Sequence, residues 1–244
     1  MKNLKEILFK VTVEAIYGDT STVVKEICFN SKKVKKDSLF VAINGYNTDG
    51  HNFISDAINN GAAIIVCETL PEGFENLKSV FVKVKCSKSA LSIISSNFYD
   101  NPSSKIDLIG ITGTNGKTTI SSLLYELFNK FSIDSGLIST INIMYRNQKI
   151  DSTNTTPDSI SINYHLSQMV KSNVKICFME VSSHGIDQKR IEGLLFKGVI
   201  FTNLTHDHID YHKSFANYRD TKKKIFDSLS NKSFSLINSD DRNS

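Results

Sequence analysis

Apolar residues recur along this chain at two different spacings. Short, largely apolar runs predict buried strands, and residues 38–43, 79–84 and 174–181 are of this kind. Stretches with apolar positions three and four residues apart predict amphipathic helices. Because the two patterns alternate, we predict an α/β protein whose main sheet is mostly parallel and doubly wound.

The first part of the chain reads as a separate, smaller α/β domain. After the strand at 38–43, residues 51–68 predict a helix, a glycine stop and a second strand. Residues 87–105 predict a helix that ends in a linker rich in Asn, Pro and Ser. We therefore expect a first domain at residues 1–103 and a second at residues 104–244.

The second domain continues the alternation. Residues 106–112 predict a strand and 117–131 a helix, while 197–204 and, more weakly, 232–238 predict two further strands. The apolar positions of the helix are Ile120, Leu123, Leu124, Leu127 and Phe128. The chain stops soon after the last strand with no closing helix, so we expect the sequence to be truncated within this domain.

Composition and charge narrow the class of protein. The net charge of +4 is spread over lysines along the whole chain, which gives no support for nucleic-acid binding. No run is long enough to span a bilayer, and the amphipathic start lacks the apolar core of a signal peptide. The four cysteines have neither CxxC nor metal-ligand spacing, and Cys67 and Cys177 read as buried thiols. We expect a cytoplasmic monomer with no membrane or nucleic-acid partner.

The sequence GITGTNGKTT at residues 110–119 resembles a phosphate-binding loop that opens a helix. The strict P-loop has a glycine five positions before the Gly-Lys pair, where this chain has isoleucine. Gly113 and Gly116 would still let the backbone turn its N–H groups onto phosphate oxygens. Lys117 would then reach the outer phosphates of a nucleotide, and Thr118 would offer its hydroxyl to Mg²⁺. A glycine-rich turn without a ligand is the alternative, but the order strand, loop, Lys-Thr-Thr, helix favours a phosphate site.

Polar residues follow two of the apolar strands. In open α/β sheets, ligands bind at the carboxyl ends of the strands, so Glu180 at the end of one run is a candidate metal-binding acid. Around the end of the strand at 197–204 come Asn203, His206, Asp207, His208 and His212. A single histidine there is more often structural, but this group favours a site, and its spacing is not that of a zinc site.

A lysine interrupts the apolar stripe of the next predicted helix, for which Ser214 is a plausible N-cap. The apolar residues of that helix are Phe215, Tyr218, Ile225, Phe226 and Leu229. Lys222 occupies the middle of the stripe, whereas Lys223 and Lys224 rotate off it. Lys222 either snorkels from the edge of the core or has a function, and periodicity alone leaves both open.

Four segments in order and spacing resemble the Mur ligase family. They are TGTNGKTT, MEVSSHGIDQKR, FTNLTHDHIDYH and YRDTKKKIF. The N-terminal segment from Asn30 to Ala63 resembles the uridine-binding domain of the family's MurE branch, so the resemblance covers nearly the whole chain. It implies an ATP-dependent ligase of peptidoglycan synthesis. Such a ligase phosphorylates the D-Glu γ-carboxylate of UDP-MurNAc-L-Ala-D-Glu and adds a diamino acid through the acyl phosphate.

The resemblance also implies roles for individual residues. ATP would be bound by Gly113, Thr114, Asn115, Gly116, Lys117, Thr118 and Thr119. Magnesium would be held by Thr118, Glu180, His208 and Lys222, the last as an N6-carboxylysine made with CO₂. Lys117, Lys222 and His208 would be the catalytic residues. The carbamate fits the apolar stripe, because burial lowers the pKa of a lysine and supplies the neutral amine that CO₂ attacks.

The implied substrate contacts come from both domains. The uridine would lie near Phe29, Ser31, Tyr46, Asn47 and Thr48, and the muramoyl-peptide near Asn154, Thr155, Thr156, Ser182, Gln188 and Arg190. Arg190 could instead be a surface charge, although a guanidinium suits a carboxylate or pyrophosphate. Asp158 is the expected N-cap of a helix that follows the threonine-rich loop.

The chain departs from the MurE pattern in two places. It has Asn30, Ser31 and Lys32 where the family commonly has Asp-Ser-Arg, and lysine lacks the planar fork of arginine. The family's C-terminal domain, which receives the amino acid, is expected to lie beyond residue 244, so the sequence does not choose between meso-diaminopimelate and L-lysine. Two alternatives remain open: a non-catalytic module that binds nucleotide or UDP-sugar, and another Mur or folylpolyglutamate-type ligase.

Overall fold

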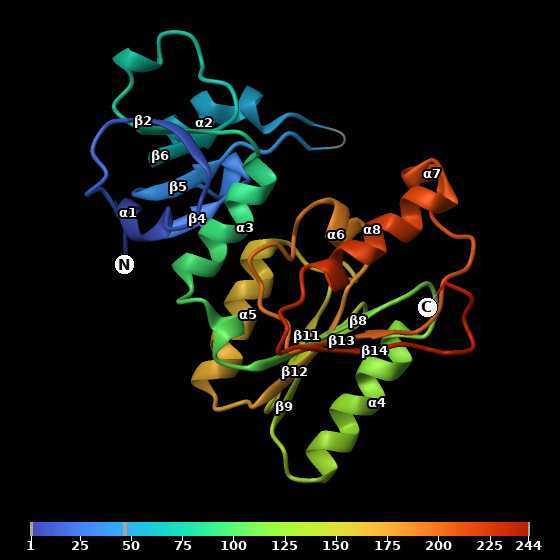
Figure 1. The fold of residues 1–244 in the computed structure, drawn as a ribbon. Helices are drawn as coiled ribbons and strands as arrows, with labels where there is room; N and C mark the ends of the chain where they lie inside the picture. The colour runs from blue at the N-terminus through green and yellow to red at the C-terminus, as the bar shows by residue number, and fades with distance from the viewer. Residues whose placement is uncertain (1, 46–47, 244) are drawn as a thin grey trace. The chain divides into compact units, whose positions relative to one another are not determined.

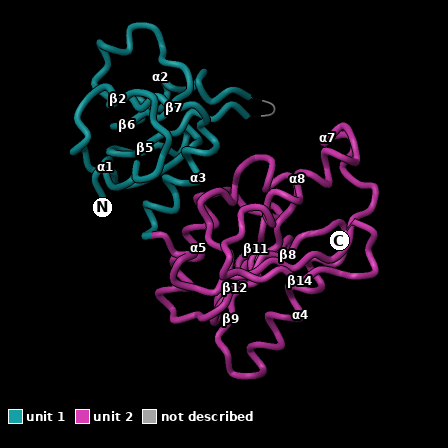
Figure 2. The backbone as a smooth tube through the Cα atoms, viewed as in Figure 1, with its two compact units in different colours: residues 1–100 teal, residues 101–244 magenta. Residues whose placement is uncertain are grey.

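The computed structural model describes residues 2–45 and 48–243, which form two compact units. Unit 1 is residues 1–100 and unit 2 is residues 101–244 (Figure 2). No helix within the described ranges is long and apolar enough to cross a membrane.

Unit 1 is built on a five-stranded sheet with the order β2-β7-β6-β5-β4. Its strands are β2 (Val13–Tyr17), β4 (Glu26–Cys28), β5 (Ser38–Val41), β6 (Ala62–Cys67) and β7 (Val80–Val84). Neighbours from β4 to β7 are parallel, and β2 is antiparallel to β7. The three longer apolar strands were predicted. The edge strands β2 and β4 were not, because β2 is half-exposed and β4 is only three residues long.

The remaining strands and α-helices of unit 1 are short, apart from α3. They are β1 (Lys2–Asn3), β3 (Val23–Val24), α1 (Leu4–Ile7), α2 (Ile54–Asn59) and α3 (Ser87–Phe98). The predicted helix near residue 51 starts as a 3₁₀ turn at Gly50–Phe53 before it becomes α2.

Unit 2 contains a seven-stranded sheet with the order β11-β10-β9-β12-β8-β13-β14 (Figure 1). Its strands are β8 (Asp107–Thr112), β9 (Ser135–Ile138), β10 (Asn142–Tyr145), β11 (Gln148–Asp151), β12 (Ile176–Glu180), β13 (Gly198–Phe201) and β14 (Phe234–Leu236). The five strands from β9 to β14 in this order are parallel, and β10 and β11 add an antiparallel hairpin at the edge. The mostly parallel α/β fold is therefore confirmed. Strands β9, β10 and β11 were missed.

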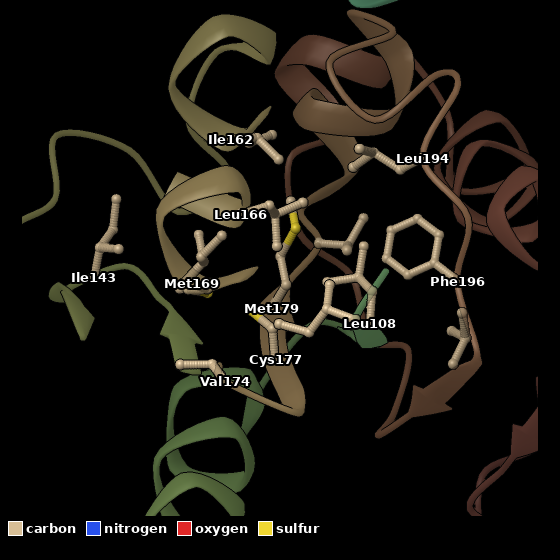
Figure 3. Close-up of a cluster of buried hydrophobic side chains, with 14 of the residues drawn as sticks. Leu108, Ile143, Ile162, Leu166, Met169, Val174, Cys177, Met179, Leu194 and Phe196 are labelled. Atoms are coloured by element: carbon tan, nitrogen blue, oxygen red, sulfur yellow. The ribbon is translucent and has the colours of Figure 1, made fainter. Parts of the chain in front are cut away.

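Helices cover both faces of this sheet, as a doubly wound fold requires (Figure 1). The helices of unit 2 are α4 (Lys117–Lys130), α5 (Ser159–Lys171), α6 (Ser183–Asp187), α7 (Ile209–His212) and α8 (Phe215–Asp227). Because side chains alternate along a strand, Leu108 of β8 packs into the cluster under α5 and α8, and its neighbour Ile109 faces α4. Figure 3 shows the larger cluster, which includes Leu108, Ile162, Leu166, Met169, Cys177 and Met179.

Two predicted helix caps are confirmed. The Asp158 carboxylate accepts a hydrogen bond from the N–H of Ser161 at 3.0 Å, and the Ser214 hydroxyl accepts one from the N–H of Asn217 at 3.1 Å. Only some of the apolar positions predicted for the buried side of α4 face the sheet. Ile120, Leu124 and Phe128 pack on the sheet together with Tyr125, whereas Leu123 and Leu127 are exposed.

Candidate active site

The phosphate loop connects the end of β8 to the start of α4. Both of its glycines have backbone angles that favour glycine, with φ of +145° at Gly113 and +83° at Gly116. A Cβ atom on Gly113 would lie 2.0 Å from the side-chain oxygen of Thr202, so the loop packs directly against the end of β13. The described residues leave open space around Gly116, so only its backbone conformation calls for glycine there.

Residues that directly follow β13 form hydrogen bonds with this loop. The N–H of Thr114 donates to the main-chain oxygen of Asn203 at 2.8 Å, and the N–H of Asn115 donates to the Asn203 side-chain oxygen at 3.0 Å. The Thr202 hydroxyl donates in return to the carbonyl of Asn115 at 2.7 Å. The 14-residue helix α4 follows, and the first N–H groups of a helix, which have no partner within it, attract anions. The predicted ATP residue Thr119 lies exposed in this first turn.

Lys117 is folded back onto the loop. Its Nζ donates to the carbonyl oxygen of Gly113 at 2.9 Å and to that of Thr114 at 2.8 Å. Burial lowers the pKa of this lysine, and the negative charges of Glu180 and Asp207 partly offset that effect. The lysine predicted to reach the phosphates therefore lies folded onto the loop, where it feels the charge of the buried acid Glu180.

Glu180 is fully buried at the end of β12, and the Thr118 hydroxyl donates to its Oε2 at 3.0 Å. Two oxygens that bind one octahedral Mg²⁺ at about 2.0–2.1 Å lie about 3 Å apart. The two side chains thus have the spacing of neighbouring Mg²⁺ ligands. The proton of Thr118 goes to the carboxylate, which leaves its oxygen lone pairs for a cation. The predicted ligands Thr118 and Glu180 fit this ion.

Thr140 also holds Glu180, and sequence reasoning missed it. Its N–H donates to Oε1 at 3.0 Å and its hydroxyl to Oε2 at 2.9 Å. Thr140 lies two residues past the end of β9, which pairs with β12 in parallel. The rule that ligands bind at the carboxyl ends of strands could have found it, but only with β9 recognised.

Lys222 is buried in α8 with 3% of its surface exposed. Its Nζ donates to the carbonyl of Gly113 at 2.9 Å and lies 4.9 Å from the centre of the Tyr218 ring. Burial, reinforced by the positive charge of Lys117, lowers the pKa of Lys222 to about 7. Its burial on the apolar stripe is confirmed, and the snorkelling alternative is excluded. Lys223 and Lys224 are exposed, as predicted. The carbamate itself stays a prediction.

The histidines beyond β13 form an aromatic group with a residue that the sequence did not single out. The ring of His184 lies 4.9 Å from that of His208 and 4.1 Å from that of Tyr211. His208 is exposed and has a φ of +52°, and its ring centre is 6.2 Å from that of Tyr218, which in turn contacts Lys222. Within residues 2–45 and 48–243, no three His, Cys, Asp or Glu side chains are arranged to hold a metal ion. The role of His208 stays a prediction.

The residues predicted to contact the muramoyl-peptide mostly lie together. The Arg190 guanidinium donates to Gln188 Oε1 at 2.7 and 3.1 Å and to the carbonyl of Thr156 at 2.5 Å. The Thr156 hydroxyl lies 3.1 Å from that of Ser182, and Ser182 also caps α6. Burial lowers the pKa of Arg190, so this residue is not a freely solvated surface charge.

Two further predicted contacts lie on the neighbouring loop. The Thr155 hydroxyl is 3.1 Å from that of Thr140, which connects the loop to Glu180. Asn154 is exposed, and its carbonyl accepts a hydrogen bond from the Ser152 hydroxyl at 2.8 Å.

The predicted uridine residues belong to unit 1. Phe29 is 40% exposed, so its ring is available to a ligand, whereas Ser31 is buried at the start of a 3₁₀ turn. The carbonyl of Thr48 accepts a hydrogen bond from the N–H of Gly45 at 3.0 Å. Tyr46 and Asn47 lie outside the described residues.

Known protein families and relatives match this chain over most of its length. The family profile described as the Mur ligase middle domain matches residues 111–244. The profile described as the Mur ligase family, catalytic domain, matches residues 23–99. A relative from Cytophaga hutchinsonii is 50% identical over 239 residues, covering 98% of this chain and 49% of that protein. One from Phocaeicola vulgatus is 46% identical over 241 residues, covering 98% and 49%. Both are named UDP-N-acetylmuramoyl-L-alanyl-D-glutamate--2,6-diaminopimelate ligase, and the chain spans about half of their length.

Solved structures share the fold. A structure of UDP-N-acetylmuramoyl-L-alanyl-D-glutamate--2,6-diaminopimelate ligase has a TM-score of 0.78 at 24% identity, covering 99% of this chain and 48% of that one. A structure of MurF from Acinetobacter baumannii has a TM-score of 0.69 at 15% identity, covering 98% and 49%. At such identities the likeness concerns the fold alone.

Proposed function

This chain belongs to the Mur ligase family, and on that premise we propose that it forms the UDP-sugar-binding and ATP-binding part of a MurE-branch ligase. In the proposed reaction, ATP phosphorylates the γ-carboxylate of D-Glu in UDP-MurNAc-L-Ala-D-Glu. The amine of a diamino acid attacks the resulting acyl phosphate, phosphate leaves, and an amide bond forms. This is a step of peptidoglycan synthesis. The cytoplasmic location and monomeric state expected from the sequence stay predictions.

The observation that carries the proposal is the position of Lys222. A buried lysine beside a phosphate loop is not needed for simple nucleotide binding, and here its Nζ lies 2.9 Å from the carbonyl of Gly113 within that loop. Its pKa of about 7 leaves about half of the amine neutral at pH 7 and able to react with CO₂. In our proposal the carbamate on Lys222 supplies an oxygen ligand to a second Mg²⁺ near His208.

The residues of the loop would bind and orient ATP. The N-terminus of α4 attracts the phosphates, and Lys117 leaves the carbonyls of Gly113 and Thr114 to contact the transferring phosphoryl group. Thr118 and Glu180 would hold Mg²⁺, which when bound neutralises negative charge on that group. Both side chains are anchored in rigid elements, so they need little rearrangement to bind.

Arg190 and its neighbours would orient the peptide end of the UDP-linked substrate. A half-buried guanidinium that already engages Gln188 and Thr156 is a preorganised partner for a carboxylate. For the incoming amino acid we propose 2,6-diaminopimelate rather than L-lysine. The support is that relatives 46% and 50% identical to this chain are named for it.

Phosphate release tests the proposal. In the complete enzyme, with ATP, Mg²⁺ and 2,6-diaminopimelate present, release should depend on added UDP-MurNAc-L-Ala-D-Glu, and L-lysine should not replace the diamino acid. Binding of ATP and the UDP-sugar without turnover would instead favour the non-catalytic alternative. Phosphate release that does not depend on the UDP-linked substrate would point to another ATP-dependent ligase. Carbon-13 NMR with labelled bicarbonate should show one carbamate that Lys222→Ala removes and Lys223→Ala keeps.

A further inference from the structure

Thr140 contacts both oxygens of the Glu180 carboxylate. Its N–H donates to Oε1 at 3.0 Å and its hydroxyl donates to Oε2 at 2.9 Å. A carboxylate with one bond can rotate about its last torsion, but one held at both oxygens by the same residue has a defined plane. Thr140 therefore holds both oxygens of the predicted magnesium ligand, and Thr118 donates a further hydrogen bond to Oε2.

The turn that carries Thr140 is itself held firmly. Thr140 and Ile141 are the two central residues of the four-residue turn 139–142, which joins β9 to β10. The buried Ser139 closes this turn, because its N–H and its hydroxyl both donate to the carbonyl of Asn142, at 3.0 and 2.8 Å. The N–H of Asn142 donates back to the Ser139 oxygen at 3.1 Å. In the sheet, Ile138 at the end of β9 is the partner of Met179, which brings the turn beside Glu180.

The direction of the hydrogen bonds follows from the chemistry of the groups. An ionised carboxylate only accepts, so the hydroxyls of Thr118 and Thr140 are the donors in their hydrogen bonds to Glu180. The Thr140 hydroxyl is also placed to donate to the Thr155 hydroxyl at 3.1 Å, so its one proton can serve either the carboxylate or Thr155. Thr140 thus lies between the Thr155 hydroxyl and the Glu180 carboxylate and contacts both.

We propose that Thr140 is a positioning residue that sets the orientation of Glu180 for Mg²⁺ and joins it to the substrate loop at Thr155. This inference rests on the proposed function, because it assumes that Glu180 binds Mg²⁺ beside ATP. Groups that hydrogen-bond a metal-binding carboxylate orient it, and their loss weakens metal binding by about tenfold to a hundredfold. Thr140 does not itself touch the ion or the reacting atoms in this assignment.

The test compares Thr140→Val with Thr140→Ser in the 244-residue chain. Calorimetry measures the affinity for ATP in the presence of Mg²⁺ and in the presence of EDTA. The ratio of these two affinities is the gain that Mg²⁺ provides. The hydroxyl is lost in T140V, so the gain should fall by about tenfold to a hundredfold while the affinity in EDTA stays the same. T140S keeps the hydroxyl and should behave like the wild type. Thr69→Val, the same exchange at an exposed threonine of unit 1, should also leave the gain unchanged.

Two results would overturn the inference. An unchanged Mg²⁺-dependent gain in T140V means that the hydroxyl does not orient Glu180, and equal losses in T140V and T140S mean that another property of the side chain matters. If circular dichroism shows that T140V does not fold, the same measurement is made on Thr140→Ala. Alanine also lacks the hydroxyl but does not place a branched side chain in the turn. A wild-type chain that binds ATP with no gain from Mg²⁺ would refute the proposed function, and this inference with it. If the wild type shows the Mg²⁺-dependent gain and only the variants lose it, the result concerns the role of Thr140 and leaves the proposed function standing.

Discussion

Lys117 and Lys222 come from different helices, and the Nζ atoms of both donate to one carbonyl oxygen, that of Gly113, at 2.9 Å each. The charge of Lys117 therefore adds to burial in lowering the pKa of Lys222. To contact a phosphate, Lys117 has to leave this carbonyl, whereas Lys222 is held in place by its burial in α8. The two lysines can be tested separately.

Lys222→Met should change how stability depends on pH. The pKa of Lys222 falls from 10.5 to about 7 on folding, so between these pH values the unfolded chain binds the additional proton. The free energy of unfolding therefore rises with pH in this window, by up to about 1.4 kcal/mol per pH unit, and this contribution is lost as pH falls toward 7. Urea unfolding from pH 7 to 8.5 in CO₂-free buffer, below the range in which the thiols of the unfolded chain ionise, should show a steeper rise in the wild type and in Lys223→Met than in K222M. Parallel slopes in all three would contradict the buried, neutral lysine.

Lys222→Ala should remove most of the ligase activity of the complete enzyme, and short carboxylates should partly restore it. A carboxylate that enters the vacated space could replace the carbamate oxygens at the second Mg²⁺. Phosphate release with and without added acetate or formate measures the rescue. Lys223→Ala and Lys224→Ala should stay near wild type, because both side chains are exposed. Equal losses at all three positions would refute the assignment.

Lys117→Ala should weaken ATP binding by roughly tenfold to a hundredfold, because a hydrogen bond to a charged group contributes about 1.5–3 kcal/mol. UDP-sugar binding should remain, since the predicted uridine residues are in unit 1. Titration of the 244-residue chain with each ligand measures both affinities. Lys130→Ala, an exposed lysine at the end of the same helix, is the matched control. Loss of both affinities in a folded K117A protein would contradict the division of roles between the units.

Gly113→Ala and Gly116→Ala should differ strongly in stability. At Gly113 a Cβ would meet the Thr202 oxygen at 2.0 Å with φ at +145°, so strain of about 1–3 kcal/mol adds to overpacking of about 1–3 kcal/mol. At Gly116 the new methyl group meets open space, and the left-handed backbone alone costs about 1–2 kcal/mol. Urea unfolding of the two variants measures the difference. A Gly116→Ala protein as unstable as Gly113→Ala would mean that the contact with Thr202 is unimportant.

Arg190→Lys should weaken binding of UDP-MurNAc-L-Ala-D-Glu although the charge is kept. Lysine cannot reproduce the planar fork with which Arg190 engages Gln188 and the carbonyl of Thr156. Isothermal titration should show a loss of roughly tenfold or more, in line with a charge-assisted pair. Arg146→Lys, the same exchange at an exposed arginine paired with Asp134, is the control and should bind normally. An unchanged affinity in R190K would remove Arg190 from the substrate site.

Several parts of this site could be predicted from local pattern alone. The phosphate loop is a contiguous run, and the helix period placed Lys222 on the buried face and its neighbours on the exposed one. The N-caps Asp158 and Ser214 were equally readable, because a cap bonds to an N–H only three residues away. Such features depend on residues close together in the chain, which is why the sequence determines them.

Other parts were decided only by the tertiary structure. Strand β9 is four residues long and includes a serine and a glycine, so its burial comes from its neighbours in the sheet and not from a strong apolar run of its own. Without β9, nothing indicated that Thr140 would meet Glu180, which is 40 positions away. The group around His184 likewise assembles from α6 and α7. Sequence therefore determined which side chains could do chemistry. The order β9-β12-β8-β13 decided which of them meet, because contacts between distant residues depend on strand order, which local periodicity does not encode.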